Sequence, residues 1–474
     1  MRRLAATAVV ALVTACAPGQ VPPPTTVAPQ VSPTTTTKAP PAPAVDAAAG
    51  LGDRMFPDLG NAGYDAISYD VALDIDSELT EVQGRTAMTA VAGVSLSSFV
   101  VDFSAGEVVS VTVDGTAATW ERSGRDLRIT PSSAPISAGA EFVVMIEHRG
   151  RIEPIQRTAF PFPTGWQIGD QSRYLFSQPD GASAVFPVND HPSDRADVTL
   201  VITVPAPHSA VSGGRRLDPL EGDGPGVHRF EIREVAPYLV PLAVGPFESV
   251  VAADGTMIWI PVGDAVPAGF DRQAEILAAL EADLGPYPFD SIGALIVDDD
   301  LPAALETQTL PTYTRVSAEW REPVIAHELA HQWFGNEIAL GQWDDIWLNE
   351  GFATFMTWRW IERDRGRDAY EEEVGRAWQT VFSSRLPPPD HPPGQDLFNL
   401  SVYLRGGLTL AALRDFVGDE RFFEFVRQYV AAFSDDVVTT ERFLTFVLVV
   451  LGPDAEQLVI DWIRDPELPP NPLG

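Results

Sequence analysis

The residues best suited to chemistry are two histidines and a glutamate within residues 321–360. His327 and His331 stand four positions apart, and Glu328 directly follows the first of them. Side chains at i and i+4 share one face of an α-helix, so both imidazoles can bind one metal ion. Apolar residues recur at helical spacing over 324–334, which predicts that helix. Glu328 is then placed to act as a general base on a metal-bound water.

A third ligand is expected nineteen positions after His331, at Glu350. Glu350 lies in a second stretch of helical apolar spacing, residues 347–360. The alternative is a chance motif whose histidines are merely hydrogen-bonded near the core, and a third candidate ligand on a second helix argues against it. Two histidines and one glutamate leave a corner of a zinc tetrahedron open, which is typical of catalytic sites. We therefore expect one Zn²⁺ per chain, bound by His327, His331 and Glu350.

Two longer motifs resemble the zinc core of the aminopeptidase N family of zinc metallopeptidases, which are gluzincins. They are His-Glu-Leu-Ala-His-Gln-Trp-Phe-Gly-Asn at 327–336 and Trp-Leu-Asn-Glu-Gly-Phe-Ala at 347–353. The resemblance implies that Glu328 is the catalytic base and Glu350 the third zinc ligand. It extends over nearly all of residues 64–466 and implies a short bacterial lipoprotein-type member, without the long C-terminal helical domain of larger relatives.

The resemblance also implies how a substrate's amino end is bound. The family has a Gly-Ala-Met-Glu-Asn edge strand whose glutamate binds the free amino group, and here Ala304 and Glu306 match it. Ala303 and Thr307 replace the glycine and the asparagine, which makes the fit of the strand against substrate less secure. The alternative for Glu306 is a solvated surface carboxylate.

Two further residues are assigned by position within the family pattern. Gln178 lies eight residues before a Phe-Pro pair, where relatives have a glutamine that lines the pocket for the first substrate side chain. Tyr403 begins a Tyr-Leu-Arg-Gly segment that resembles the family's Tyr-x-Lys-Gly, whose tyrosine points its hydroxyl at the oxyanion of the tetrahedral intermediate. The alternatives are a turn glutamine and a buried core tyrosine.

The elements that must position these residues fall into two parts. From residue 64 to about 250, runs such as 67–75 alternate apolar and polar residues between turns rich in Gly, Pro and Asp. This pattern predicts an antiparallel β-sandwich. After about residue 252 the apolar period becomes helical, as at 276–284. We expect an α+β multidomain fold, with an N-terminal antiparallel β-sandwich (51–250) followed by a thermolysin-like, mainly helical zinc peptidase domain (251–474).

The amino end has the features of a lipoprotein signal peptide over residues 1–16. Two arginines precede an apolar run at 4–13 that is too short to span a bilayer, and the run ends in Val-Thr-Ala-Cys, which resembles a bacterial lipobox. Cys16 is the only cysteine, so no intramolecular disulfide can form. We expect lipidated Cys16 to anchor an exported chain to the outer face of the cell membrane; the alternative is a secreted protein. Residues 17–50, rich in Pro and Thr, are expected to form a disordered tether.

The charge balance excludes one class of partner. Net charge is −34, from 66 acidic and 32 basic residues. Such a surface repels nucleic acid, so we expect no nucleic-acid partner. The expected partners are peptides with a free N-terminus, and the expected activity is that of a zinc-dependent aminopeptidase. Two rival functions are a zinc endopeptidase of the thermolysin type and a catalytically idle, surface-binding lipoprotein.

Overall fold

The strand-rich half is built around an eight-stranded sheet, whose long central strands are β2 (Tyr64–Ile75) and β3 (Glu81–Ala92). β2 buries the alternating apolar side chains expected from Tyr69 onward. A register shift beside Ile67 turns that side chain outward, so it is exposed, contrary to the predicted stripe. The order of the sheet is β14 (Arg215–Leu217), β15 (Val227–Val235), β12 (Ala196–Thr203), β2, β3, β9 (Glu141–Arg151), β5 (Glu107–Val113) and β6 (Thr116–Ala117).

The structure is a computed structural model, and it describes residues 43–474 apart from 158–159, 218–219, 221–222 and 254. Cys16 and most of the expected tether therefore lie outside the described residues. Among those that are described, no helix has both the length and the apolar character needed to cross a membrane.

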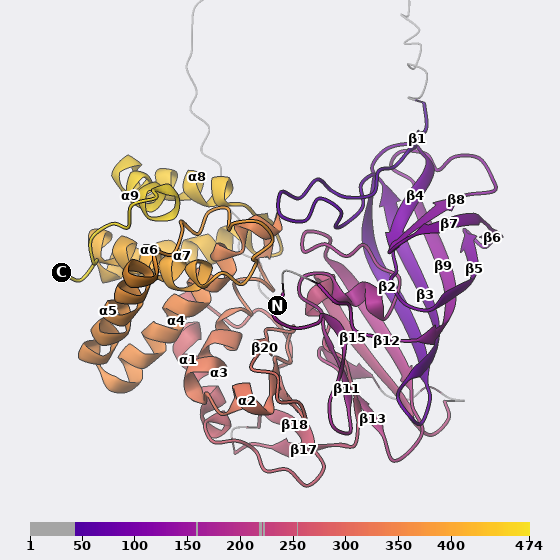
Figure 1. The fold of residues 1–474 in the computed structure, drawn as a ribbon, viewed down its shortest axis with the longest axis horizontal. Helices are drawn as coiled ribbons and strands as arrows, with labels where there is room; N and C mark the ends of the chain where they lie inside the picture. Colours follow the sequence, from indigo (N-terminus) through magenta and orange to yellow (C-terminus); the bar gives the residue numbers. More distant parts are fainter. Residues whose placement is uncertain (1–42, 158–159, 218–219, 221–222, 254) are drawn as a thin grey trace, which may run out of the picture. The chain divides into compact units, whose positions relative to one another are not determined.

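Two smaller sheets complete the strand-rich half (Figure 1). One has the order β1 (Val45–Asp46), β4 (Leu96–Asp102), β8 (Asp126–Thr130) and β7 (Thr119–Ser123). The other has the order β10 (Gly165–Ile168), β11 (Arg173–Phe176), β16 (Ala243–Gly245) and β13 (Ser209–Val211). Pairing in the eight-stranded sheet is antiparallel except between β12 and β2, which run parallel. This half is therefore the strand-rich domain that the alternating pattern predicts, with two parallel pairs added, β12 with β2 and β1 with β4.

A five-stranded sheet introduces the helical half. Its order is β17 (Phe247–Val251), β18 (Met257–Pro261), β19 (Gly293–Val297), β21 (Thr312–Thr314) and β20 (Ala304–Leu305). β17 spans residue 250, where we expected the two domains to divide. β20 lies at the edge of this sheet and, among the strands of the described residues, pairs only with β21, so one side of its backbone has no strand partner there. An edge of this kind can pair with an extended peptide.

The helices that follow carry the predicted chemistry (Figure 1). They are α1 (Gln273–Leu284), α2 (Arg315–Ala318), α3 (Glu322–Ala330), α4 (Trp347–Arg365), α5 (Arg367–Ser384), α6 (Leu400–Val417), α7 (Asp419–Phe433), α8 (Thr440–Leu451) and α9 (Pro453–Arg464). Short 3-10 turns lie at η1 (Gly181–Ala184), η2 (Pro237–Leu239), η3 (Phe270–Arg272) and η4 (Trp343–Asp345), and a small sheet joins β22 (Ala339–Leu340) to β23 (Val437–Val438). α1 covers the helical apolar stretch expected at 276–284 and is followed by Gly285, where φ is 107°.

One buried histidine makes the stability of the strand-rich half depend on pH. His148 on β9 is 3% exposed, and neither ring nitrogen has a hydrogen-bond partner among the described residues. Its ring lies 4.6 Å from that of Phe103 and over Gly84, where a side chain would collide with it. Burial lowers the pKa of His148 to about 4. The unfolded chain therefore binds this proton more readily than the folded chain does.

We predict that the free energy of unfolding falls less between pH 7 and pH 5 in His148→Leu than in the wild type. Between the ordinary histidine pKa and about 4 the folded chain loses stability as pH falls, by about 3 kcal/mol in full at 1.36 kcal/mol per pKa unit. Denaturant unfolding at the two pH values measures the difference. Identical pH dependence in His148→Leu and wild type would contradict the prediction.

Candidate active site

The two histidines are positioned by α3 and by the residue that ends it. α3 stops at Ala330, so the helix predicted through residue 334 is shorter than expected. His331 nevertheless keeps helical dihedral angles, φ −60° and ψ −21°, and its backbone N–H donates to the carbonyl oxygen of His327 over 3.2 Å. The i, i+4 relation therefore survives at the helix end, and the two imidazole centroids lie 4.7 Å apart.

Glu350 reaches the same point from α4. Its Oε2 lies 3.2 Å from Nε2 of His327 and 3.4 Å from Nε2 of His331. The Nδ1–H of His331 donates to the carbonyl oxygen of Phe334 over 3.0 Å, which leaves Nε2 free to bind a metal. One donor atom from each of the three side chains lies within 4.8 Å of the other two. Two imidazole nitrogens and one carboxylate oxygen at this spacing fit a Zn²⁺ ion with an open position.

Tyr403 is brought beside these ligands by a close contact between α4 and α6. Gly351 on α4 faces Gly406 on α6, where a Cβ on either glycine would approach the other backbone to 2.9 Å. The Tyr403 ring lies parallel to that of His327, with the centroids 6.1 Å apart. Burial, reinforced by Glu350 and nearby glutamates, raises the pKa of Tyr403 well above its ordinary value. Its hydroxyl therefore stays protonated and able to donate.

Glu306 follows the edge strand β20 and lies on the inner side of the site. Its side chain is 3% exposed, and Oε1 has no hydrogen-bond partner in the described part of the chain. The Glu306 carbonyl accepts from the side-chain amides of Gln332 and Asn336, over 3.2 and 2.9 Å. Thr307, in place of the family's asparagine, donates through its hydroxyl to the carbonyl oxygen of Leu310 over 2.6 Å. The strand is therefore held in place by contacts that survive the substitutions around it.

The site concentrates negative charge away from water. Burial raises the pKa of Glu328 well above its usual value, and it raises the pKa of Glu306 although His331 acts against it. Burial also raises the pKa of Glu350, but His331 and His327 outweigh that effect and lower it to about 2. Burial lowers the pKa of His331, but the nearby carboxylates of Glu350 and Glu306 outweigh burial and raise this pKa to about 10. The raised pKa values of Glu328, Glu306 and His331 therefore favour an added positive charge, whereas burial lowers the pKa of His327.

All predicted site residues of the described chain line a single cavity of about 530 Å³. They are His327, Glu328, His331, Glu350, Tyr403, Glu306, Ala304 and Gln178. Gln178 is 4% exposed, and its Nε2 has no hydrogen-bond partner among the described residues. The backbone carbonyl oxygen of Gln178 accepts from the hydroxyl of Thr164 over 3.0 Å. Gln178 therefore belongs to the wall of the site and is not an exposed turn residue.

Several residues that shape the site were not predicted from the sequence. Gln332 and Asn336 lie inside the quoted zinc motif, so the motif itself offered a signal for them. Tyr238 of η2 accepts from the side-chain amide of Asn349 over 3.5 Å, next to the ligand Glu350, and no local pattern marks it. Phe162 and Phe398 form part of the cavity wall from segments far apart in the sequence.

Comparisons with known proteins agree with this geometry. The Peptidase family M1 domain matches residues 270–462. The crystal structure of an M1 zinc metallopeptidase from Deinococcus radiodurans is 31% identical, with a TM-score of 0.80, and covers 89% of this chain and 99% of that one. The same protein has been solved bound to a Tyr-Ser-Ala substrate.

Two curated relatives are longer than the part of them that this chain matches. Endoplasmic reticulum aminopeptidase 2 of Homo sapiens is 28% identical over 304 residues, which cover 56% of this chain and 31% of that protein. Leucine aminopeptidase 2 of Aspergillus niger is 25% identical over 402 residues, which cover 76% of this chain and 64% of that protein. The chain therefore spans less than two thirds of the length of each.

A strand-rich half followed by a helical half, with two histidines and a glutamate converging beside a buried glutamate, defines a zinc metallopeptidase. With the near-complete match to the Deinococcus radiodurans structure, the chain belongs to peptidase family M1.

We predict that Glu328→Gln keeps its zinc, because all three ligands remain. It should lose at least ~10²-fold in turnover, the lower end of the range for one acid–base group. Glu350→Ala should instead lose zinc, because one of three ligands is gone. Metal analysis of both purified variants beside wild type tests this pair. Stoichiometric zinc in Glu350→Ala would remove Glu350 from the ligand set, and normal turnover in Glu328→Gln would remove Glu328 from the chemistry.

Proposed function

We propose that this chain is a zinc-dependent aminopeptidase that hydrolyses the N-terminal peptide bond of peptides. The observation that carries the proposal is the buried Glu306 carboxylate, whose Oε1 has no partner among the described residues although it lies beside the zinc ligands. A buried carboxylate oxygen without a partner is costly, and a substrate ammonium is a partner of matching charge and size.

The spacing within the site supports cleavage after the first residue. Donor atoms of Glu306, Glu328 and His331 lie within 4.8 Å of one another. One extended residue spans roughly 3.3–3.6 Å. An amino group bound at Glu306 therefore leaves room for a single residue before the carbonyl that faces Glu328 and the metal ligands. The edge strand β20 supplies unpaired backbone groups to align that residue.

The roles of the chain's own groups follow from their positions. Zn²⁺ bound by His327, His331 and Glu350 would supply Lewis-acid chemistry for polarising the carbonyl and activating water. Glu328 accepts a proton from the attacking water and returns it to the leaving amine. Tyr403, protonated and partly buried, donates its hydroxyl to the developing oxyanion.

Two rival functions explain less of the site. A thermolysin-type endopeptidase has no use for a buried Glu306 whose Oε1 lacks a partner among the described residues, at the position where a longer substrate would continue. A surface-binding lipoprotein without activity has no use for Glu328 beside a complete set of ligands. The Deinococcus radiodurans protein is described with a Tyr-Ser-Ala substrate, which also favours peptides as the substrates here.

We predict that Glu306→Ala lowers kcat/KM for peptides with a free amino end, because a buried ammonium loses its partner. Such losses cost roughly 2–5 kcal/mol, which corresponds to about 30- to several-thousand-fold in kcat/KM. Glu306→Gln, which keeps the shape and removes the charge, should be impaired to a similar degree. Zinc content and the unfolding midpoint serve as controls and should stay close to wild type.

Acetylated peptides sharpen the same test, since they have no ammonium to bind. Wild type should cleave them far more slowly than the free peptides. Equal cleavage of both by the wild type would show that Ala303 and Thr307 have abolished the anchor, and the chain would then be an endopeptidase.

We propose further that the exported chain is anchored through lipidated Cys16, with the secreted form as the alternative. The support is the short apolar run that ends in Val-Thr-Ala-Cys, followed by a Pro- and Thr-rich stretch. Mass spectrometry of the native protein should find Cys16 as a diacylated amino terminus. An unmodified amino terminus beyond residue 16 would refute the anchor.

A further inference from the structure

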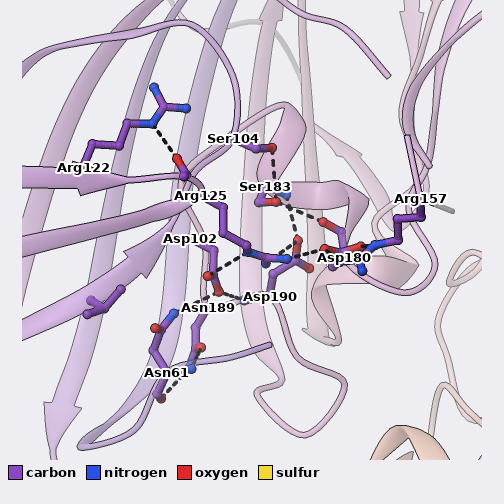
Figure 2. Close-up of polar contacts among 12 residues, drawn as sticks. Asn61, Asp102, Ser104, Arg122, Arg125, Arg157, Asp180, Ser183, Asn189 and Asp190 are labelled. Atoms are coloured by element: carbon purple, nitrogen blue, oxygen red, sulfur yellow. Dashed lines mark hydrogen bonds and ion pairs between the residues drawn. The ribbon is translucent and has the colours of Figure 1, made fainter. Parts of the chain in front are cut away.

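A buried ion cluster lies behind the Gln178 wall of the cavity. Its centre is Asp180, whose side chain is 1% exposed and which pairs with both Arg125 and Arg157. The Nε of Arg157 donates to Oδ1 of Asp180 over 2.8 Å. Figure 2 shows the two guanidinium groups reaching the Asp180 carboxylate from opposite sides. Neither the zinc chemistry nor the amine anchor uses this cluster.

The Arg125 side of the cluster is fixed in the strand-rich core. Arg125 also donates to Asp102 over 3.1 Å and lies 3.7 Å from Asp190. Asp102 accepts from the backbone N–H of Asp190 and from the side-chain amide of Asn61, both over 2.9 Å. Three carboxylates face two guanidinium groups, so Arg125 is already shared and cannot replace Arg157. Asp180 is therefore held on one side by the fixed Arg125, and it depends on Arg157 for its second cation.

The Arg157 side of the cluster leads to the cavity. The backbone N–H of Phe160 donates to the carbonyl oxygen of Arg157 over 3.2 Å, and Pro161 and Phe162, which follow, line the cavity. The Phe162 ring lies 5.9 Å from that of Phe176, on the same wall. The position of Arg157 therefore sets where this aromatic segment, residues 160–162, stands.

The other partner of the ion pair leads to the same cavity. Gln178, two residues before Asp180, lines the cavity, and the Thr164 hydroxyl bridges the carbonyl oxygens of Phe176 and Gln178, over 3.1 and 3.0 Å. Apart from the zinc ligands and the glutamates Glu306 and Glu328, no charged side chain among the described residues lines the cavity. The rest of the wall is apolar or neutral, which suits an uncharged substrate side chain.

We propose that Arg157 is a specificity-positioning residue: its ion pair with Asp180 holds Phe162 and Gln178 at the separation that an apolar first side chain of the substrate fills. The inference rests on the proposed aminopeptidase function. Arg157 does not touch substrate, and it acts through the two wall segments that it joins. Loosening the pair widens this part of the cavity and leaves Glu306, Glu328, Tyr403 and the zinc ligands where they are.

The test compares leucine and alanine amides as substrates of the full-length zinc enzyme. In Arg157→Ala, kcat/KM for the leucine amide should fall about tenfold or more, the range for lost apolar pocket contacts. The alanine amide, which fills little of the pocket, should lose far less. The loss should appear mainly in KM, because contacts to the side chain are removed and the acid–base groups are not. Arg157→Lys keeps the charge without the two-pronged geometry and should recover part of the selectivity.

Two further variants separate positioning from stability. Arg229→Ala breaks an ion pair with Asp223 of similar exposure, 19% against 21% for the arginine side chains, and should leave the leucine-to-alanine ratio unchanged. Phe160→Ala leaves the ion cluster whole and does not line the cavity, but removes the ring that packs 5.3 Å from that of Phe398. It should lower the ratio even if Arg157→Ala fails to fold.

An equal loss on both amides in Arg157→Ala, or an unchanged ratio in a folded Arg157→Ala or Phe160→Ala, would overturn the inference. A wild type that hydrolyses neither amide would instead refute the proposed function, so the two failures are distinct.

Discussion

Three buried glutamates share one small site with two imidazoles, and the rest of the site depends on how that charge is neutralised. Glu306, Glu328 and Glu350 are 3%, 5% and 3% exposed. Burying an unpaired carboxylate costs several kcal/mol, so these groups need cations close by. When both imidazoles are neutral ligands of a metal, one divalent ion and one ammonium balance three carboxylates in number of charges. The charge of the site thus favours the binding of two cations at adjacent positions, a metal ion and an amino group.

The geometry that joins these charges comes from close helix packing. Glycine in a helix interior is destabilising by roughly 0.5–1 kcal/mol relative to alanine, yet Gly351 and Gly406 face one another where α4 crosses α6. A side chain at either position would push the helices apart. The distance between Glu350 and Tyr403 would then grow, since each lies within three residues of the contact. Local helix stability is given up here for the placement of Glu350, the proposed metal ligand, and Tyr403, the proposed oxyanion donor.

Sequence reasoning succeeded where one helix turn or one motif carries the information. His327 and His331 needed only the helical period, and that relation held although α3 ends at Ala330. Glu306 and Gln178 were located by resemblance, and the structure brings both to the cavity. Ile67 shows the limit of a simple period, because one register shift in β2 turned it outward.

The remaining contacts join segments that no period relates. Tyr238 meets Asn349 across 111 residues, and Phe162 meets Phe398 at 6.1 Å between ring centroids. Neither pair has a local signature, because each side chain alone resembles an ordinary core residue. Long-range pairs of this kind are fixed only by the complete fold.

Chemistry and recognition therefore come from different parts of the chain. The zinc ligands, Glu328 and Tyr403 lie within residues 327–403 of the helical half, whereas Gln178 and Phe162 come from the strand-rich half. Glu306, the proposed amine anchor, follows an edge strand of the five-stranded sheet. Substitutions in the strand-rich half can then alter which side chain is accepted without moving the groups that break the bond. A metal centre held by neighbouring helices determines the reaction. The strand-rich half determines which substrate side chain is accepted, through contacts such as that of Arg157 with Asp180.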